Sequence, residues 1–267
     1  MYLQGTIAEG MRYGAVSPKD YTGLIGWWKA SEGVEFSQGS SISKWKDLSG
    51  NENHMVPQTS TGGTTDAAGS LVNTSNGLGI TRILSARTLV DVNNNIHPYL
   101  CDGGAFTIVF VLRTNNLAST ANILRPTPQS NKNGIIFSIY QPNGATVPQI
   151  NNMVYDNTGL KASILTAAPY ISPSQGAIYM NVNYGYGSAV VNPYQFLFNN
   201  VLKASTAYTS APVYVSGNPF SFLPNAAIYM YEIIIYNNTG KSVAQIDHEK
   251  NTLYNDYILK QYPNLFL

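Results

Sequence analysis

Oxygen-bearing side chains recur at every second position of one short polar segment. They belong to Asp47, Ser49, Asn51 and Asn53. The ligands of calcium-binding loops show this alternation, and Gly50 allows a tight turn among them. Only Asp47 is charged, however, and no glutamate follows at the offset of a bidentate ligand. We therefore favour a structural turn, in which Asp47 accepts backbone N–H groups and Trp45 enters the core, and keep a calcium site as the alternative.

The acidic residues show no pair arranged for catalysis. Glycoside hydrolysis needs two carboxylates that flank the glycosidic bond, whereas the 14 Asp and Glu are scattered. Glu232 has no acidic residue two or four positions away, so we expect it to be hydrogen-bonded within a sheet. His54, His97 and His248 lack metal-ligand spacing, and no nucleophile motif or phosphate loop occurs. The prediction is a protein that is not an enzyme and has no metal or other cofactor.

A tyrosine-containing segment is the best candidate for recognition. Asn183-Tyr184-Gly185-Tyr186-Gly187 combines two aromatic rings with an amide in an uncharged stretch. Aromatic rings flanked by amides suit stacking on sugars or contact with proteins. The same tyrosines could equally be ordinary packing. Asn183, Tyr184 and Tyr186 are the candidate contact residues for a glycan or a protein.

The composition indicates a β-rich protein with a mostly neutral surface. Hydrophobic residues make up 44% and charged residues 11% of the 267 residues, against about 25% charged residues in typical domains. A formal net charge of +1 predicts binding to neither nucleic acid nor an anionic membrane. The single cysteine, Cys101, is expected to be a small buried residue. The apolar runs are too short for a membrane helix, and residues 1–5 show no signal-peptide pattern.

Short apolar runs separated by Asn-Gly-type turns predict many antiparallel strands in a sandwich or barrel. The predicted strands are Leu24–Trp28, Ile42–Lys46, Phe106–Leu112, Gly134–Tyr140, Ala177–Val182, Tyr194–Phe198, Val213–Val215 and Ala227–Tyr236. Segment 57–79, rich in Thr, Ser, Gly and Asn, predicts an exposed, mobile loop. Apolar residues at helical spacing predict one helix over 242–261, with Ser242 as N-cap and Pro263 as a stop.

Both ends of this pattern resemble one family. Gly26–Val34 contains Trp27-Trp28 and an Ala-Ser pair, and Trp45–His54 reads W-x-D-x-S-G-N-x-N-H. These segments resemble the opening of the concanavalin A-like lectin/glucanase (laminin G-like) sandwiches of bacterial surface proteins and phage structural proteins. Ile228–Asn237 is similar to the family's final E-I-I-x-Y-N strand. The resemblance implies an all-β, antiparallel two-sheet jelly-roll sandwich with the helix packed on it. The catalytic E-x-D-x-x-E string of the glucanases is absent from the sequence.

The expected organisation is an N-terminal arm and one folded domain. Residues 1–22 predict an extended arm, either disordered or docked on a partner or on the domain's own flank, and residues 23–267 predict the sandwich with helix 242–261. Together with the low charge, the resemblance suggests a non-enzymatic phage virion protein. It would decorate a capsid or form part of a fibre, contact other virion proteins through its arm and assemble as a homo-oligomer in the host cytoplasm. Such a protein could retain weak affinity for surface glycans.

The alternative hypothesis places the protein in a bacterium. It is a carbohydrate-binding module or adhesin domain, secreted or at the cell surface, whose export signal was removed.

Overall fold

A computed structural model provides the structure of the chain. It describes residues 16–37, 41–59, 69–74, 77–82, 87–91, 93, 95–96, 98, 100, 104–114, 121–126, 134–140, 149–156, 158–167, 176–212, 220–222 and 228–265. Cys101, His97 and the predicted strand Val213–Val215 lie outside these residues. None of the helices in the described part is long and apolar enough to cross a membrane.

Seventeen strands are found among the described residues. Their bounds are β1 (Leu24–Lys29), β2 (Val34–Phe36), β3 (Ile42–Trp45), β4 (Met55–Thr59), β5 (Gly69–Thr74), β6 (Gly77–Arg82), β7 (Arg87–Asp91), β8 (Phe106–Thr114), β9 (Ala121–Pro126), β10 (Gly134–Tyr140), β11 (Gln149–Asp156), β12 (Gly159–Ala167), β13 (Gly176–Asn183), β14 (Tyr194–Phe198), β15 (Val201–Thr206), β16 (Phe220–Phe222) and β17 (Ile228–Asn237). The helical elements with described bounds are the 3-10 helix η1 (Pro18–Asp20), α2 (Val243–Thr252), the π-helical segment η2 (Leu253–Ile258) and α3 (Leu259–Gln261).

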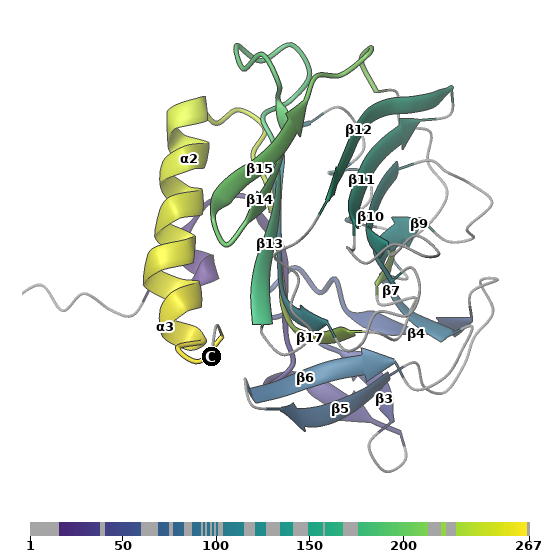
Figure 1. The fold of residues 1–267 in the computed structure, drawn as a ribbon. Coiled ribbons are helices and arrows are strands. Elements are labelled where there is room, and N and C mark those ends of the chain that lie inside the picture. The colour runs from purple at the N-terminus through teal and green to yellow at the C-terminus, as the bar shows by residue number, and fades with distance from the viewer. Residues whose placement is uncertain are drawn as a thin grey trace, which may run out of the picture.

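The strands form two antiparallel sheets (Figure 1). Sheet A has the order β15-β14-β13-β8-β17-β6-β5, and β1 also pairs with β17. Sheet B has the order β12-β11-β10-β9-β16-β7-β4-β3-β2. This architecture confirms the predicted all-β, two-sheet sandwich with one C-terminal helix.

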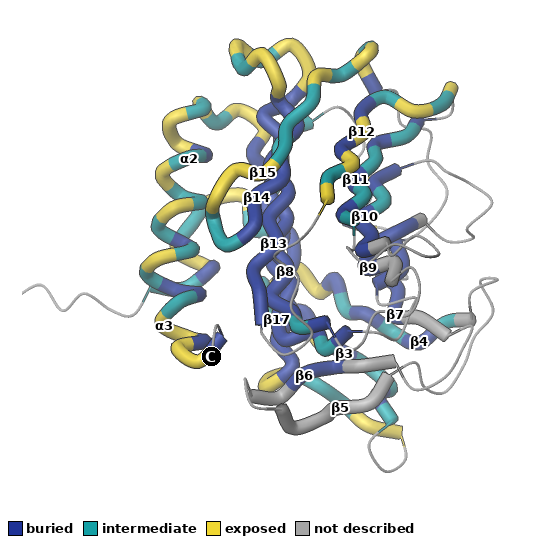
Figure 2. The backbone as a smooth tube through the Cα atoms, viewed as in Figure 1, coloured by how far each residue is buried: buried dark blue, intermediate teal, exposed yellow. Residues whose placement is uncertain are grey.

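The main core lies between the two sheets. Alternate residues of facing strands meet there, as in the stacked rings of Phe110 from β8 and Phe137 from β10, whose centroids are 5.0 Å apart. Trp28 and Trp45 are completely buried in the same core. Figure 2 shows the buried residues concentrated along the central strands of sheet A and the inner side of sheet B.

A second core lies on the other face of sheet A, beneath the C-terminal helix. Along β13, Tyr179 faces sheet B whereas Ile178 and Met180 face the helix. Every residue of β13 is therefore buried, although successive residues of a strand point to opposite faces. Burial on both faces explains why the central strands appear as continuous apolar runs rather than as an alternating pattern.

The predicted helix forms with the expected cap. Ser242 and Gln245 make reciprocal capping hydrogen bonds with each other's backbone N–H groups. The helix ends at Gln261, two residues before Pro263. Its middle departs from the α-helical expectation, because Leu253–Ile258 adopts π-helical geometry where it packs on sheet A.

The prediction of an exposed loop over 57–79 is wrong for 57–59, 69–74 and 77–79, which form strands, while 60–68 and 75–76 lie outside the described residues. This segment contains the end of β4, all of β5 and the start of β6, and β5 and β6 pair as an antiparallel hairpin. β5 is at the edge of sheet A, and β6 meets β17 through the pair Ile80 and Met230. Backbone hydrogen bonds define the pairing of this mixed sequence, and buried Ile80 attaches the hairpin to the main core.

Part of the predicted arm docks on the flank of the sandwich. The capped 3-10 helix η1 lies there, and Tyr236 donates its hydroxyl to the carbonyl of Pro18 at 2.9 Å. Lys241 donates to the carbonyl of Thr22 at 2.7 Å, and the ring of Tyr21 makes a T-shaped contact with Tyr236. Residues 16–22 thus follow the docked alternative, while residues 1–15 lie outside the described residues.

Candidate functional site

The Asp47 carboxylate is the centre of the turn between β3 and β4. Its Oδ1 accepts the backbone N–H groups of Trp27 at 2.9 Å and Ser49 at 2.8 Å. Its Oδ2 accepts the Ser49 hydroxyl at 2.6 Å and the backbone N–H of Asn53 at 3.1 Å. Gly50 has a φ of +98°, a conformation that glycine adopts without strain. One buried carboxylate thus satisfies three backbone donors and fixes the turn to β1.

The neighbouring side chains of this turn also bond to the protein. Asn51 and Asn53 donate their amide groups to backbone carbonyls of β1, and buried Trp45 donates Nε1 to another β1 carbonyl at 3.0 Å. His54 accepts the backbone N–H of Asp47 on Nδ1 at 3.1 Å. Within the described residues, no group of three or more His, Cys, Asp or Glu could hold a metal ion. The geometry favours the structural turn over the calcium loop, because hydrogen-bond donors occupy both oxygen atoms of Asp47.

A second buried carboxylate, Glu232, lies between β17 and the C-terminal helix. Its Oε1 accepts Nε1 of Trp27 and the hydroxyl of Tyr257 at 2.6 Å, and its Oε2 accepts the hydroxyl of Tyr262 at 2.8 Å. Burial raises the pKa of Glu232, although the three hydrogen bonds and nearby Lys29 partly offset this effect. We expected Glu232 to be hydrogen-bonded within its sheet, and of its three donors only Trp27 belongs to that sheet. The other two donors come from the helical end of the chain, because this face of β17 packs against it. Glu232 therefore connects β1, β17 and the C-terminal segment.

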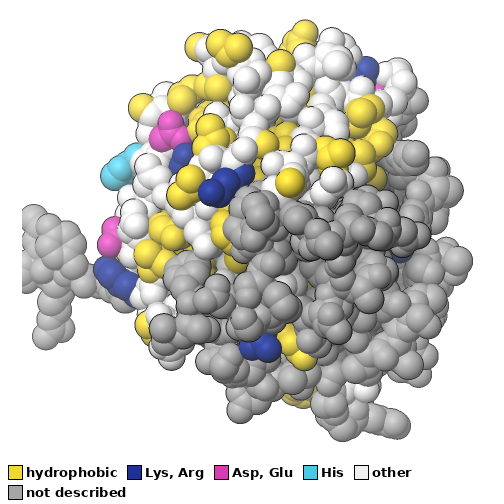
Figure 3. Space-filling model, viewed as in Figure 1, with side chains coloured by type: hydrophobic (Ala, Val, Ile, Leu, Met, Phe, Trp, Pro, Cys, Tyr) yellow, Lys and Arg dark blue, Asp and Glu magenta, His cyan; other side chains and the backbone are white. Residues whose placement is uncertain are grey.

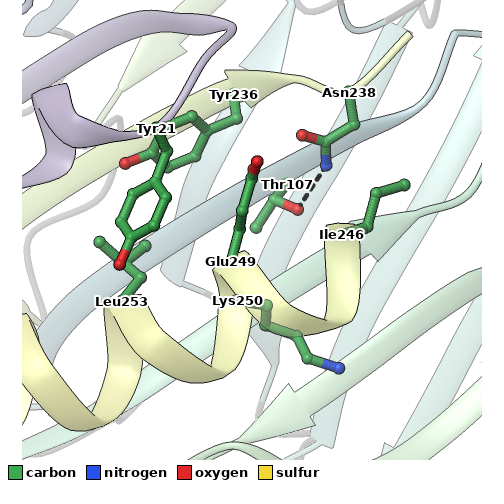
Figure 4. Close-up of a pocket in the computed structure, with 8 residues that line it drawn as sticks. All are labelled: Tyr21, Thr107, Tyr236, Asn238, Ile246, Glu249, Lys250 and Leu253. Atoms are coloured by element: carbon green, nitrogen blue, oxygen red, sulfur yellow. Dashed lines mark hydrogen bonds between the residues drawn. The ribbon is translucent and has the colours of Figure 1, made fainter. Parts of the chain in front are cut away.

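A small cavity lies beneath helix α2 (Figure 4). It is lined by Tyr21, Thr107, Tyr236, Asn238, Ile246, Glu249, Lys250 and Leu253. Its volume is about 10 Å³, which is roughly the space of one water molecule. Asn238 donates to Oγ1 of Thr107 at 2.8 Å beside it. This cavity is too small for a sugar ring.

The structure separates the three predicted contact residues. The amide of Asn183 is buried and bonds to two backbone groups, at 2.9 and 3.0 Å. Tyr184 is also buried and donates its hydroxyl to Asp247 at 2.6 Å. Tyr186, in contrast, is 51% exposed. Asn183 and Tyr184 hold the loop from inside, whereas Tyr186 presents its ring to solvent.

Tyr208 supports the exposed ring from the side. The centroids of Tyr186 and Tyr208 are 6.2 Å apart at an interplanar angle of 75°. The next residue, Thr209, donates its backbone N–H and its hydroxyl to the carbonyl of Lys161 at 2.9 and 3.1 Å. The ammonium group of Lys161 donates to the hydroxyl of Ser210 at 2.8 Å. We call Tyr186, Tyr208, Thr209, Ser210 and Lys161 the Tyr186 surface. It joins the β13–β14 loop and the segment after β15 to strand β12 of sheet B.

The loop that carries Tyr186 is attached to helix α2. The hydroxyl of Tyr184 and the ammonium group of Lys250 both donate to Oδ1 of Asp247, at 2.6 and 2.9 Å. Burial alone would raise the pKa of Asp247, but these hydrogen bonds and the charge of Lys250 lower it overall. The base of the loop is closed by the backbone bond from Tyr184 to Pro193 at 2.9 Å. A loop fixed in this way loses little conformational entropy when it binds a ligand.

The surface around this end of the sandwich is largely uncharged. Figure 3 shows hydrophobic side chains scattered among uncharged polar ones over the upper half of the visible face. The edge strands β12 and β15 lie next to each other. Exposed hydrophobic side chains of these strands and of the β13–β14 loop are Leu160, Leu165, Val191, Val201 and Leu202.

Sequence reasoning singled out Tyr186 but none of the other residues of the Tyr186 surface. Tyr208, Thr209 and Ser210 lie in a polar stretch without periodicity. Lys161 follows shortly after the turn-type sequence Asn157-Thr158-Gly159, which is the one local signal near it. Only the approach of sheet B to the end of β15 brings these residues together.

Comparisons with known proteins bear on the fold. No protein-family model and no curated protein matches the chain. The ligand-binding domain of botulinum neurotoxin serotype D in complex with N-acetylneuraminic acid aligns with a TM-score of 0.52 and 13% identity, over 91% of this chain and 54% of that chain. A structure of botulinum neurotoxin type C, whose cell entry depends on two ganglioside molecules, aligns with a TM-score of 0.58 and 12% identity, over 89% and 51%.

A third similar structure is domain 4 of AbnA, a GH43 extracellular arabinanase from Geobacillus stearothermophilus, in complex with arabinotriose. Its TM-score is 0.50 at 10% identity, over 85% of this chain and 97% of that chain. The chain shares an all-β sandwich fold with these domains. The chain spans about half the length of the neurotoxin chains but almost all of the arabinanase domain. The sandwich part of the sequence resemblance is thus supported, and the link to phage proteins stays a prediction.

Proposed function

We propose that this chain is a non-catalytic glycan-binding domain that holds sugars on the Tyr186 surface. The observation that carries the proposal is the ring of Tyr186, half exposed and supported edge-on by Tyr208 at 6.2 Å. The loop beneath it is fixed by the hydrogen bond from Tyr184 to Asp247. A rigid, exposed aromatic ring offers a stacking platform at low entropic cost.

The polar groups around the ring suit sugar hydroxyls. The hydroxyl of Tyr186 has no hydrogen-bond partner among the described residues. The hydroxyl oxygen of Ser210 accepts from Lys161 and keeps its own O–H for donation, while that of Thr209 donates to the protein and can still accept. Binding sites for small ligands combine apolar area with a few polar groups of this kind. The surface therefore offers both a ring for stacking and groups that can form hydrogen bonds with sugar hydroxyls.

The similar structures support the same class of ligand. The arabinanase domain is in complex with arabinotriose, and the serotype D domain is in complex with N-acetylneuraminic acid. Their architecture covers 85% and 91% of this chain. At 10–13% identity they contribute no matched site residues, so the position of the site rests on Tyr186 and its neighbours alone.

For the biological setting we keep the virion hypothesis. A capsid-decorating or fibre protein would use residues 1–15 to contact other virion proteins, and it would use the sandwich for glycans. The 11% of charged residues is compatible with this setting. Co-sedimentation with particles that lack the protein tests it. Glycan binding without particle association would favour the alternative of a bacterial carbohydrate-binding module or adhesin.

Glycan titration of matched variants tests the proposed site. Arabinotriose and a glycan array are applied to the wild type, to Tyr186→Ala and to the control Phe36→Ala. Phe36 is 45% exposed and belongs to β2, which ends sheet B on the side opposite to β12. We expect Tyr186→Ala to weaken binding at least tenfold, with an unchanged melting temperature, and Phe36→Ala to bind normally. Equal binding by all three proteins would remove Tyr186 from the site, and no binding by the wild type would refute the glycan-binding function.

A further inference from the structure

Lys161 of the Tyr186 surface and Lys250 of helix α2 are each paired with a carboxylate. The Lys161 ammonium lies 3.3 Å from Oδ2 of Asp156, and the two side chains are only 13% and 1% exposed. The Lys250 ammonium lies 2.9 Å from Oδ1 of Asp247. Asp247 in turn accepts the hydroxyl of Tyr184 beneath the Tyr186 loop. Each of these two ammonium groups is therefore neutralised by a carboxylate of the protein itself.

Asp156 is held in place by more than Lys161. Its Oδ1 accepts the backbone N–H and hydroxyl of Thr158, both at 2.7 Å, and the N–H of Gly159 at 3.1 Å. The carboxylate is thus part of the β11–β12 turn and cannot move away to release the lysine. If Lys161 turned toward a ligand, it would give up its ion pair with the buried Asp156 carboxylate, which is unfavourable.

This arrangement distinguishes two classes of glycan. The ring of a neutral sugar needs stacking and hydroxyl contacts, both of which the Tyr186 surface provides. The carboxylate of a sialic acid loses hydration on binding and needs a cation or several donors in return. Lys161 is the cation of the Tyr186 surface, and it is already committed to Asp156 and Ser210.

We propose that the Tyr186 surface recognises uncharged glycans and gains nothing from a sialic acid. This inference rests on the proposed function and narrows it to one substrate class. Among the similar structures, the ligand class would be that of the arabinanase domain, arabinotriose, rather than N-acetylneuraminic acid.

Paired titrations at two salt concentrations test the inference. Arabinotriose, lactose and 3′-sialyllactose are titrated against the wild type and against Asp156→Asn. The asparagine retains Oδ1 as an acceptor for Thr158 and Gly159 but removes the negative charge that pairs with Lys161. In the wild type we expect 3′-sialyllactose to bind no more tightly than lactose, and binding of the neutral sugars to change less than twofold between low and high salt. In Asp156→Asn we expect affinity for 3′-sialyllactose to rise at least threefold over lactose, in a salt-dependent way.

The possible outcomes are distinguishable. A wild-type preference of tenfold or more for 3′-sialyllactose over both neutral sugars, lost at high salt, overturns the inference but leaves the glycan-binding function standing. Absence of binding to all three probes and to the glycan array refutes the function, and the inference with it. The wild-type comparison decides the question even if Asp156→Asn does not fold.

Discussion

The cluster around Glu232 predicts a pH-dependent cost for removing a single hydroxyl group. Tyr257→Phe deletes the 2.6 Å hydrogen bond to Oε1 of Glu232 and keeps the ring that contacts Trp27 at 6.1 Å. Glu232 then retains two donors, from Trp27 and Tyr262. A hydrogen bond contributes about 1 kcal/mol when both groups are neutral and about 1.5–3 kcal/mol when one is charged. We therefore expect Tyr257→Phe to lower the free energy of unfolding by about 1 kcal/mol at pH values where Glu232 is protonated and by about 2 kcal/mol where it is ionised.

The direction of the pH dependence follows from the pKa of Glu232. Burial raises this pKa in the folded state above its ordinary value of 4.5. The folded protein then holds this proton more tightly than the unfolded chain, so the contribution of Glu232 to stability is highest below pH 4.5 and falls as the pH rises through the raised pKa. Glu232→Gln removes this titration and should flatten that part of the stability profile. Tyr257→Phe removes a bond that lowers the pKa, so its cost should grow with pH.

Urea unfolding followed by tryptophan fluorescence, at several pH values from 4.5 to 8, measures these free energies. Tyr254→Phe is the matched control. Tyr254 lies on the same helical segment and packs beside the same core, and no hydrogen bond of its hydroxyl is found among the described residues. We expect it to change the free energy of unfolding by less than about 0.5 kcal/mol. Equal losses for Tyr254→Phe and Tyr257→Phe at every pH would refute the role given to Glu232.

Three further predictions test the turn, the helix and the docked segment. Asp47→Ala should lower the free energy of unfolding by roughly 3 kcal/mol, about 1 kcal/mol for each backbone N–H that loses its acceptor. EDTA should leave the melting temperature unchanged. A fall in melting temperature on adding the chelator, reversed by calcium, would support the calcium alternative. Ending the chain at Asn238 should abolish cooperative melting because it exposes the helix-covered face of sheet A, and a sharp transition at the wild-type temperature would contradict this. Deleting residues 1–15 should leave the melting temperature unchanged. Deleting residues 1–22 should lower it, because the Tyr21 ring contact and the Pro18 hydrogen bond are lost. Equal melting temperatures of the two truncated proteins would show that the docked segment adds no stability.

Local chemistry explains the features that the sequence predicted well. Ser242 caps the C-terminal helix through contacts only three residues away, so the cap is visible in the sequence itself. The strands β8, β13 and β17 are buried on both faces and therefore appear as unbroken apolar runs. The Asp47 turn combines an acidic residue with backbone donors and a glycine within a few positions. Each of these signals comes from neighbouring residues.

The tertiary structure decided the rest, because it depends on residues that are distant along the chain. The β5–β6 hairpin lies in a stretch rich in Gly, Ser, Thr and Asn and becomes a strand pair because β6 also pairs with β17 of sheet A. Glu232 finds Trp27 from β1 and Tyr262 from the last turn of the chain, which no spacing rule connects. The division between buried Tyr184 and exposed Tyr186 likewise depends on Asp247 of helix α2 and on Tyr208 beyond β15. Sequence alone determined that the chain forms a β-sandwich with a C-terminal helix, whereas long-range packing determined which of its tyrosines faces the solvent.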